Sequence, residues 1–152
     1  SSNTITETVE VGPGPQELAK LNGEIFVSRT FYDSDWNAEH GATKIGSEVL
    51  IKNYGIGAPC GGSILKHESY IMRSFNGGLA RLNSSLELED VTIGNYNQDY
   101  IYHVEKIDDK FWFAITDHVD LNQVHVLDST GNKINDYDVG ISPGDFAIWK
   151  ND

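Results

Sequence analysis

Oxygen-bearing side chains recur at every second position in one short stretch of the chain. They belong to Asp33, Asp35, Asn37 and Glu39. Carboxylate and amide oxygens at this spacing are typical of calcium-binding loops, because Ca²⁺ prefers hard oxygen ligands supplied from a single turn. The EF-hand pattern fails, since neither its central glycine nor its final glutamate is present. We therefore predict that the protein requires no cofactor. Calcium is a candidate ligand of these four residues.

Trp36 lies inside this stretch, and His40 follows it. An indole ring covers the apolar C–H face of a sugar, while carboxylates and amides bind its hydroxyl groups. These residue types together predict a glycan site formed by Asp33, Asp35, Trp36, Asn37 and His40. The alternative interpretation is an ordinary polar surface loop with Trp36 packed into the core.

A second polar and aromatic stretch consists of Asn95, Tyr96 and Asn97. Its two amides and its phenol are able to donate and accept hydrogen bonds with sugar hydroxyls. Asn is also favoured in turns for backbone reasons, so turn formation is the alternative explanation. We predict these three residues as further ligand-binding positions.

The residue types provide no evident catalytic set. Cys60 is the single cysteine, and the five histidines show neither His-x-His nor His-x-x-x-His spacing. A lone thiol is most often structural, and it cannot form a disulfide within the chain. This fits a cytoplasmic protein or a secreted one without disulfides, and the removal of a signal peptide is left open.

The chain is strongly acidic, with 152 residues and a formal net charge of -12. Its length predicts one domain over residues 1–152. An acidic surface repels nucleic-acid phosphate and anionic membranes, and no apolar run approaches the roughly 18 residues of a membrane span. Neither nucleic-acid binding nor membrane insertion is therefore expected.

The strongest structural signal lies in residues 99–117, where apolar and polar residues alternate on both sides of a short polar break. This patterning predicts a β-hairpin. A two-residue turn would place Val104 opposite Phe113 and Tyr102 opposite Ile115. The expected core face then contains Tyr102, Val104, Phe111, Phe113 and Ile115.

Similar patterns predict short strands along the rest of the chain. Their ranges are 4–11, 24–32, 47–53, 64–75, 79–82, 86–93, 123–127, 133–139 and 145–150. Residues 16–21 are the one helix candidate, residues 33–46 are expected to be a loop, and no internal repeat is found. The chain is predicted to be all-β, an antiparallel β-sandwich or jelly roll of about nine or ten short strands with at most one short helix.

Three functions fit these features, and the preferred one is a carbohydrate-binding protein of lectin type that recognises neutral glycans through its polar and aromatic loops. The alternatives are a small glycan hydrolase that uses dispersed carboxylates and an acidic protein-binding or inhibitory module. Enzymatic activity is left open and not favoured. Trp112 on the outer face of the hairpin also predicts a homo-oligomer, because a monomer rarely exposes such apolar area.

Overall fold

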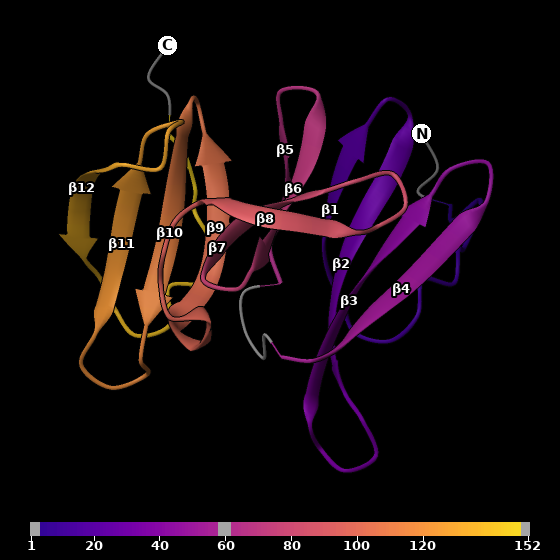
Figure 1. The fold of residues 1–152 in the computed structure, drawn as a ribbon, viewed down its shortest axis with the longest axis horizontal. Coiled ribbons are helices and arrows are strands. Elements are labelled where there is room, and N and C mark those ends of the chain that lie inside the picture. The colour runs from indigo at the N-terminus through magenta and orange to yellow at the C-terminus, as the bar shows by residue number, and fades with distance from the viewer. Residues whose placement is uncertain (1–3, 58–61, 150–152) are drawn as a thin grey trace.

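The computed structural model describes residues 4–57 and 62–149 (Figure 1). Within these residues, twelve strands form three separate four-stranded sheets. Each sheet is an antiparallel meander, in which strands that follow one another in the chain are hydrogen-bonded neighbours. The prediction of an all-β, antiparallel fold of packed sheets is confirmed, with more strands than expected.

The N-terminal sheet contains β1 (Pro15–Leu21), β2 (Glu24–Tyr32), β3 (Ala38–Ile45) and β4 (Val49–Ile56). The middle sheet contains β5 (Ile64–His67), β6 (Tyr70–Phe75), β7 (Gly78–Leu82) and β8 (Leu88–Ile93). The C-terminal sheet contains β9 (Ile101–Ile107), β10 (Lys110–Thr116), β11 (Asn122–Leu127) and β12 (Lys133–Asp138). The helical structure in the described residues is one 3-10 turn, Gln98–Tyr100, and none of their helices could cross a membrane.

The middle sheet is covered on both faces. Ile64 and Ile71 enter a core that this sheet shares with the N-terminal sheet. Leu65 and Met72, the next residues along the same strands, enter a second core shared with the C-terminal sheet. Successive side chains of a strand point to opposite faces. The consecutive residues Ile64 and Leu65, like Ile71 and Met72, therefore link the middle sheet to both of its neighbours.

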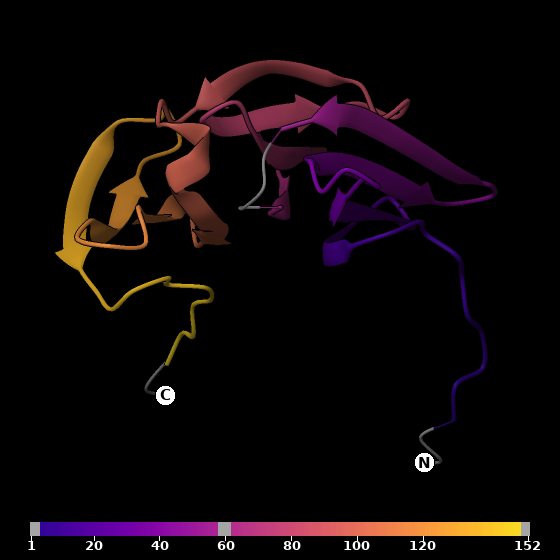
Figure 2. The same ribbon diagram turned by 90° about the horizontal axis from the view of Figure 1, so that it is seen from below.

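The three sheets follow an arc, and the described terminal segments, residues 4–14 and 139–149, lie on its concave side (Figure 2). The first strand of each sheet is its inner strand, and the inner strand β5 contacts both of the others, β1 and β9. Radial packing of four-stranded meanders is how neighbouring blades are arranged in β-propellers. The structure thus repeats a unit that the sequence analysis did not detect.

The hairpin with the strongest sequence signal is confirmed as β9 and β10. Val104 pairs with Phe113 as expected. A bulge before Ile115 then shifts the register, so that Ile115 pairs with Ile101 instead of Tyr102. Ile101 is consequently buried in the core, while Tyr102 is half-buried.

Residues 16–21 lie in strand β1 and not in the expected helix. The cause is the turn that follows, because Asn22 and Gly23 both have positive φ and close a hairpin into β2. The expected loop at residues 33–46 contains strand β3, and the expected strand at residues 64–75 is divided into β5 and β6.

The strands expected at residues 4–11 and 145–150 are not found. Residues 4–11 and 145–149 have no strand assignment, while residue 150 lies outside the described residues, as does Cys60. Alternating hydrophobicity is insufficient by itself, since a strand also needs a neighbour that completes its hydrogen bonds.

Replacing Phe113 with Ala is expected to lower the free energy of unfolding by about 3–5 kcal/mol, because its ring is fully buried between the middle and C-terminal sheets. Ile134→Ala, on exposed strand β12, is the control and should cost less than about 0.5 kcal/mol. Chemical denaturation measures both values. A loss below about 1 kcal/mol for Phe113→Ala would contradict the assigned core.

Candidate functional site

The loop between β2 and β3 is closed by the side chain of Asp33. One of its oxygens, Oδ1, accepts hydrogen bonds from the backbone N–H groups of Asp35 (2.9 Å) and Asn37 (2.8 Å). The other, Oδ2, accepts one from the side-chain amide of Asn37 at 2.9 Å. These hydrogen bonds, led by the one from the Asn37 side chain, lower the pKa of Asp33. Both oxygens of this carboxylate therefore already have partners within the loop.

The same turn, with a positive φ at its fourth residue, recurs at two other places among the described residues. Asn83 accepts hydrogen bonds from the N–H groups two and four residues later, and Asp128 does the same. The residue three positions after each capping side chain has positive φ, as Trp36, Leu86 and Gly131 show. The regular spacing of oxygen ligands that suggested calcium is thus also the spacing of a repeated turn.

Trp36 differs from its equivalent in the second turn. Leu86 is fully buried, whereas Trp36 is 81% exposed. Its ring lies beside that of Tyr32, which is 58% exposed, with the ring centroids 6.1 Å apart and the planes tilted by 48°. The alternative that Trp36 packs into the core is therefore wrong, and two neighbouring aromatic rings face solvent at this tip.

Glu39, from the candidate calcium ligands, and His40, from the predicted glycan site, both lie within strand β3. Glu39 is half-buried in strand β3. His40 is buried, stacks on Phe75 with ring centroids 5.8 Å apart, and has its Nδ1 atom 3.3 Å from the guanidinium of Arg73. Burial, followed by the charge of Arg73, lowers the pKa of His40 to about 4. His40 therefore belongs to the packing between the N-terminal and middle sheets.

Asn95, Tyr96 and Asn97 follow strand β8, in a different part of the fold from the aromatic pair. Asn95 and Tyr96 line a groove of about 440 Å³ beside the β11–β12 loop. The Tyr96 ring packs on Phe113, and its hydroxyl lies 3.2 Å from Nδ1 of His125. Asn97 caps the 3-10 turn by accepting a hydrogen bond from a backbone N–H. No residue of the β2–β3 loop lines this groove.

A larger groove, of about 610 Å³, runs along the inner strands β1, β5 and β9. Glu17 and His103 line this groove, and the buried Ser63 hydroxyl contacts both of them. Each of the three lies four residues before the last residue of an inner strand. The repeat of the fold therefore brings the same topological position of all three sheets to one place. Sequence analysis missed this cluster because its members are 40 or more residues apart.

The C-terminal segment, residues 139–149, adds Asp145 to the same groove. Residues 139–147 repeat the pattern of residues 11–19, Val-Gly-x-x-Pro-x-acid-x-Ala, in which Asp145 corresponds to Glu17. Gly14 and Ser142 are also equivalent, and both have positive φ, 64° and 55°. This repeated motif is a sequence signal for two positions of the cluster, Glu17 and Asp145.

His103 is held between carboxylates. Its Nδ1 atom lies 2.9 Å from Oε1 of Glu17, and its Nε2 atom lies 3.9 Å from Oε2 of Glu105. Burial lowers the pKa of His103, but the hydrogen bond to Glu17 and the charges of Glu17 and Glu105 outweigh that effect and raise it. A raised pKa means that His103 binds a proton more readily than a free histidine does.

The Ser63 hydroxyl is not arranged for a nucleophilic triad. It lies 3.4 Å from Nδ1 of His103, the nitrogen that already faces Glu17, whereas a triad needs the serine and the acid on opposite ring nitrogens. Ser63 is also fully buried and accepts a hydrogen bond from the Val104 N–H at 2.8 Å. The Ser63 hydroxyl thus links strands β1 and β9 through its hydrogen bonds with Glu17 and Val104.

No known protein family, curated protein or solved structure matches this chain.

Acidification from about pH 6.5 to about pH 4 is expected to destabilise the protein through His40. The unfolded chain protonates this residue near its ordinary pKa of 6.5, whereas the pKa in the folded protein is about 4. The stability contributed by neutral His40 is complete above the unfolded pKa and decreases as the pH falls through this window, by on the order of 2–3 kcal/mol.

Chemical denaturation of His40→Phe as a function of pH tests this contribution, because the replacement keeps an aromatic ring against Phe75 and cannot titrate. The variant should lose less stability than the parent between pH 6.5 and pH 4. His118→Gln, at an exposed turn, is the control and should follow the parent. Equal pH dependence in the parent and in His40→Phe would contradict the assignment.

Proposed function

We propose that this protein binds neutral glycans through Tyr32 and Trp36. The observation that carries the proposal is the exposure of two adjacent aromatic rings at the tip of the β2–β3 hairpin. Sugars present apolar C–H faces that pack well on aromatic rings, and a solvent-exposed pair of rings has no role in the core of this protein.

The polar groups beside the rings suit hydroxyl recognition. Asp35 is exposed, and its side chain has no hydrogen bond within the described residues, so its oxygens are available to sugar hydroxyls. The side-chain oxygen of Asn37 is likewise an available acceptor, because this amide uses its nitrogen to reach Asp33. The net charge of -12 disfavours sialylated and sulfated ligands, so the proposal is restricted to neutral glycans.

Calcium has no necessary part in this proposal. Both oxygens of Asp33 already accept hydrogen bonds from the loop, which fixes the loop without a bound ion. We therefore expect glycan binding to persist in the presence of a calcium chelator. Complete loss of binding on chelation would instead assign the oxygens of Asp33, Asp35, Asn37 and Glu39 to calcium.

Trp36→Ala is expected to weaken binding to neutral glycans by about tenfold or more, because it removes the larger of the two stacking surfaces. The melting temperature should change little, since the side chain is 81% exposed. A glycan array followed by titration calorimetry on the best ligand measures the affinity, and a thermal denaturation scan measures the stability.

Trp149→Ala is the matched control, because this indole is 89% exposed and lies in the C-terminal segment, away from the β2–β3 hairpin. The control should bind as the parent does, and Tyr32→Ala should show a loss similar in direction to that of Trp36→Ala. Unchanged binding by Trp36→Ala would overturn the proposed site.

Self-association belongs to the same proposal, because sugar binders gain avidity from several sites. The outer face of Trp112 does not support it, since Tyr137 stacks on this ring and Phe146 of the C-terminal segment packs against it. Edge strand β4 supports it better, with Val49, Leu50 and Ile51 each at least 40% exposed. Sedimentation should show a species above 16.9 kDa that Leu50→Lys dissociates, and a monomer at high concentration would contradict it.

A further inference from the structure

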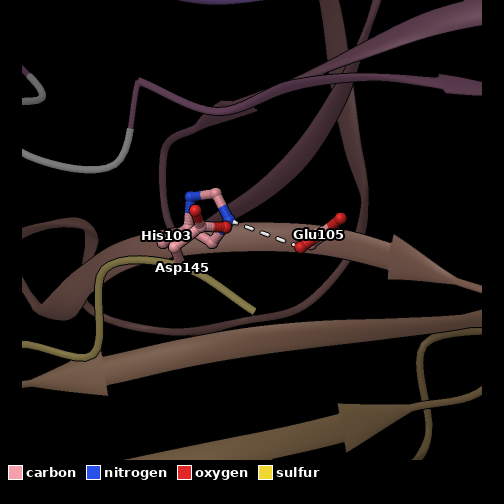
Figure 3. Close-up of side chains that lie close together, drawn as sticks. All are labelled: His103, Glu105 and Asp145. Carbon is pink, nitrogen blue, oxygen red and sulfur yellow. Dashed lines mark ion pairs between the residues drawn. The ribbon is translucent and has the colours of Figure 1, made fainter. Parts of the chain in front are cut away.

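We propose that the groove along the inner strands binds one divalent metal ion of the zinc class, with His103, Glu105 and Asp145 as its ligands. This site is separate from the proposed glycan site and does not depend on it. The nearest ligand atoms of the three residues all lie within 4.8 Å of one another, and Figure 3 shows the His103 ring beside Asp145 with Glu105 further along the same strand. Side-chain rotations would bring these atoms to the separation of about 3–4 Å that ligands of one tetrahedral ion adopt.

The orientation of His103 is the second part of the argument. Glu17 holds Nδ1 at 2.9 Å, which leaves Nε2 as the ligand atom. Histidines that bind metals commonly donate their other ring N–H to a carboxylate, because this fixes the ring and its tautomer. Glu17 would act as this positioning residue, outside the set of metal ligands.

The hydrogen-bond inventory of the groove gives an independent reason. Nε2 of His103 and Oε2 of Glu105 are both buried atoms, and neither has a hydrogen-bond partner among the described residues. They face each other at 3.9 Å, too far for a hydrogen bond. Buried polar atoms without partners are rare in folded proteins, and an ion between these two would complete the coordination of both.

The donor set indicates which metals to expect. One imidazole nitrogen with two carboxylates suits Zn²⁺, and Mn²⁺ more weakly, whereas Ca²⁺ prefers a set composed only of oxygens. One oxygen of Asp145, Oδ1, accepts a hydrogen bond from the N–H of Phe146 at 2.7 Å, and its other oxygen remains for the metal. Lys20, Lys66 and Lys106 also line the groove, and their positive charges offset those of the carboxylates. The ion must therefore be held by direct ligation and not by general negative charge.

Titration calorimetry of the full chain with zinc chloride tests the site. We expect one ion per chain with a dissociation constant of about micromolar or tighter. His103→Gln, Glu105→Gln and Asp145→Asn should each weaken binding by more than about tenfold. Glu17→Gln should weaken it less than any of these three, because the amide oxygen still accepts the hydrogen bond from Nδ1.

Three controls separate this site from other zinc binding. Asp136→Asn, an exposed carboxylate in β12, and Cys60→Ser, the single thiol, should bind as the parent does. Trp36→Ala should also keep the site, so that failure of the glycan proposal is distinguishable from failure of this one. Circular dichroism shows whether each variant is folded. Asp145→Asn is the preferred variant, because replacement of an exposed side chain disturbs folding least. Absence of zinc binding at a zinc concentration about 100-fold above the expected micromolar dissociation constant would overturn the proposal. Zinc binding that all three ligand variants retain would overturn it as well.

Discussion

The structure depends on a middle sheet that is buried on both faces. A single four-stranded meander has two faces and cannot cover either by itself, so it needs a neighbour on each side. Ile64 and Leu65 illustrate the solution, since these consecutive residues enter the two different cores. The outer sheets each gain one covered face, and their edge strands β4 and β12 remain exposed.

This packing also determines where the polar groups gather. When the sheets lie around an arc, their inner strands converge, and equivalent positions on those strands become neighbours. Glu17, Ser63 and His103 are such equivalents, and Asp145 joins them from a segment that repeats the motif around Glu17. The aromatic pair, Tyr32 and Trp36, arises differently, because a hairpin tip is free to expose side chains that the sheet would bury.

The sequence predicted local structure where one face of a hairpin is buried. The pairing of Val104 with Phe113 is predictable because alternating hydrophobicity fixes the register there. The bulge that pairs Ile115 with Ile101 instead of Tyr102 is not predictable, because it does not change the hydrophobic pattern of the sequence. The turn that divides β5 from β6 was missed because it is made by Glu68 and Ser69, with no glycine, asparagine or proline to mark it. The groove cluster was not predictable from residue spacing within one segment. The repeated Val-Gly-x-x-Pro motif indicates only two of its four positions, Glu17 and Asp145. The sequence left Trp36 open between an exposed stacking residue and a core residue, and it could not separate His40 from Trp36, because burial depends on the neighbouring sheet.

The proposed glycan site is tested most directly by the three indole N–H signals in a nitrogen-15 NMR spectrum, one for each of Trp36, Trp112 and Trp149. Trp36 is in the aromatic pair, Trp112 is covered by Phe146, and Trp149 lies in the C-terminal segment, so the three report on different surfaces. On titration with a neutral oligosaccharide, the account predicts that the Trp36 signal shifts in a saturable manner while the other two stay in place. A saturable shift confined to Trp112 or Trp149, or no shift of Trp36 with a glycan that demonstrably binds, would contradict it.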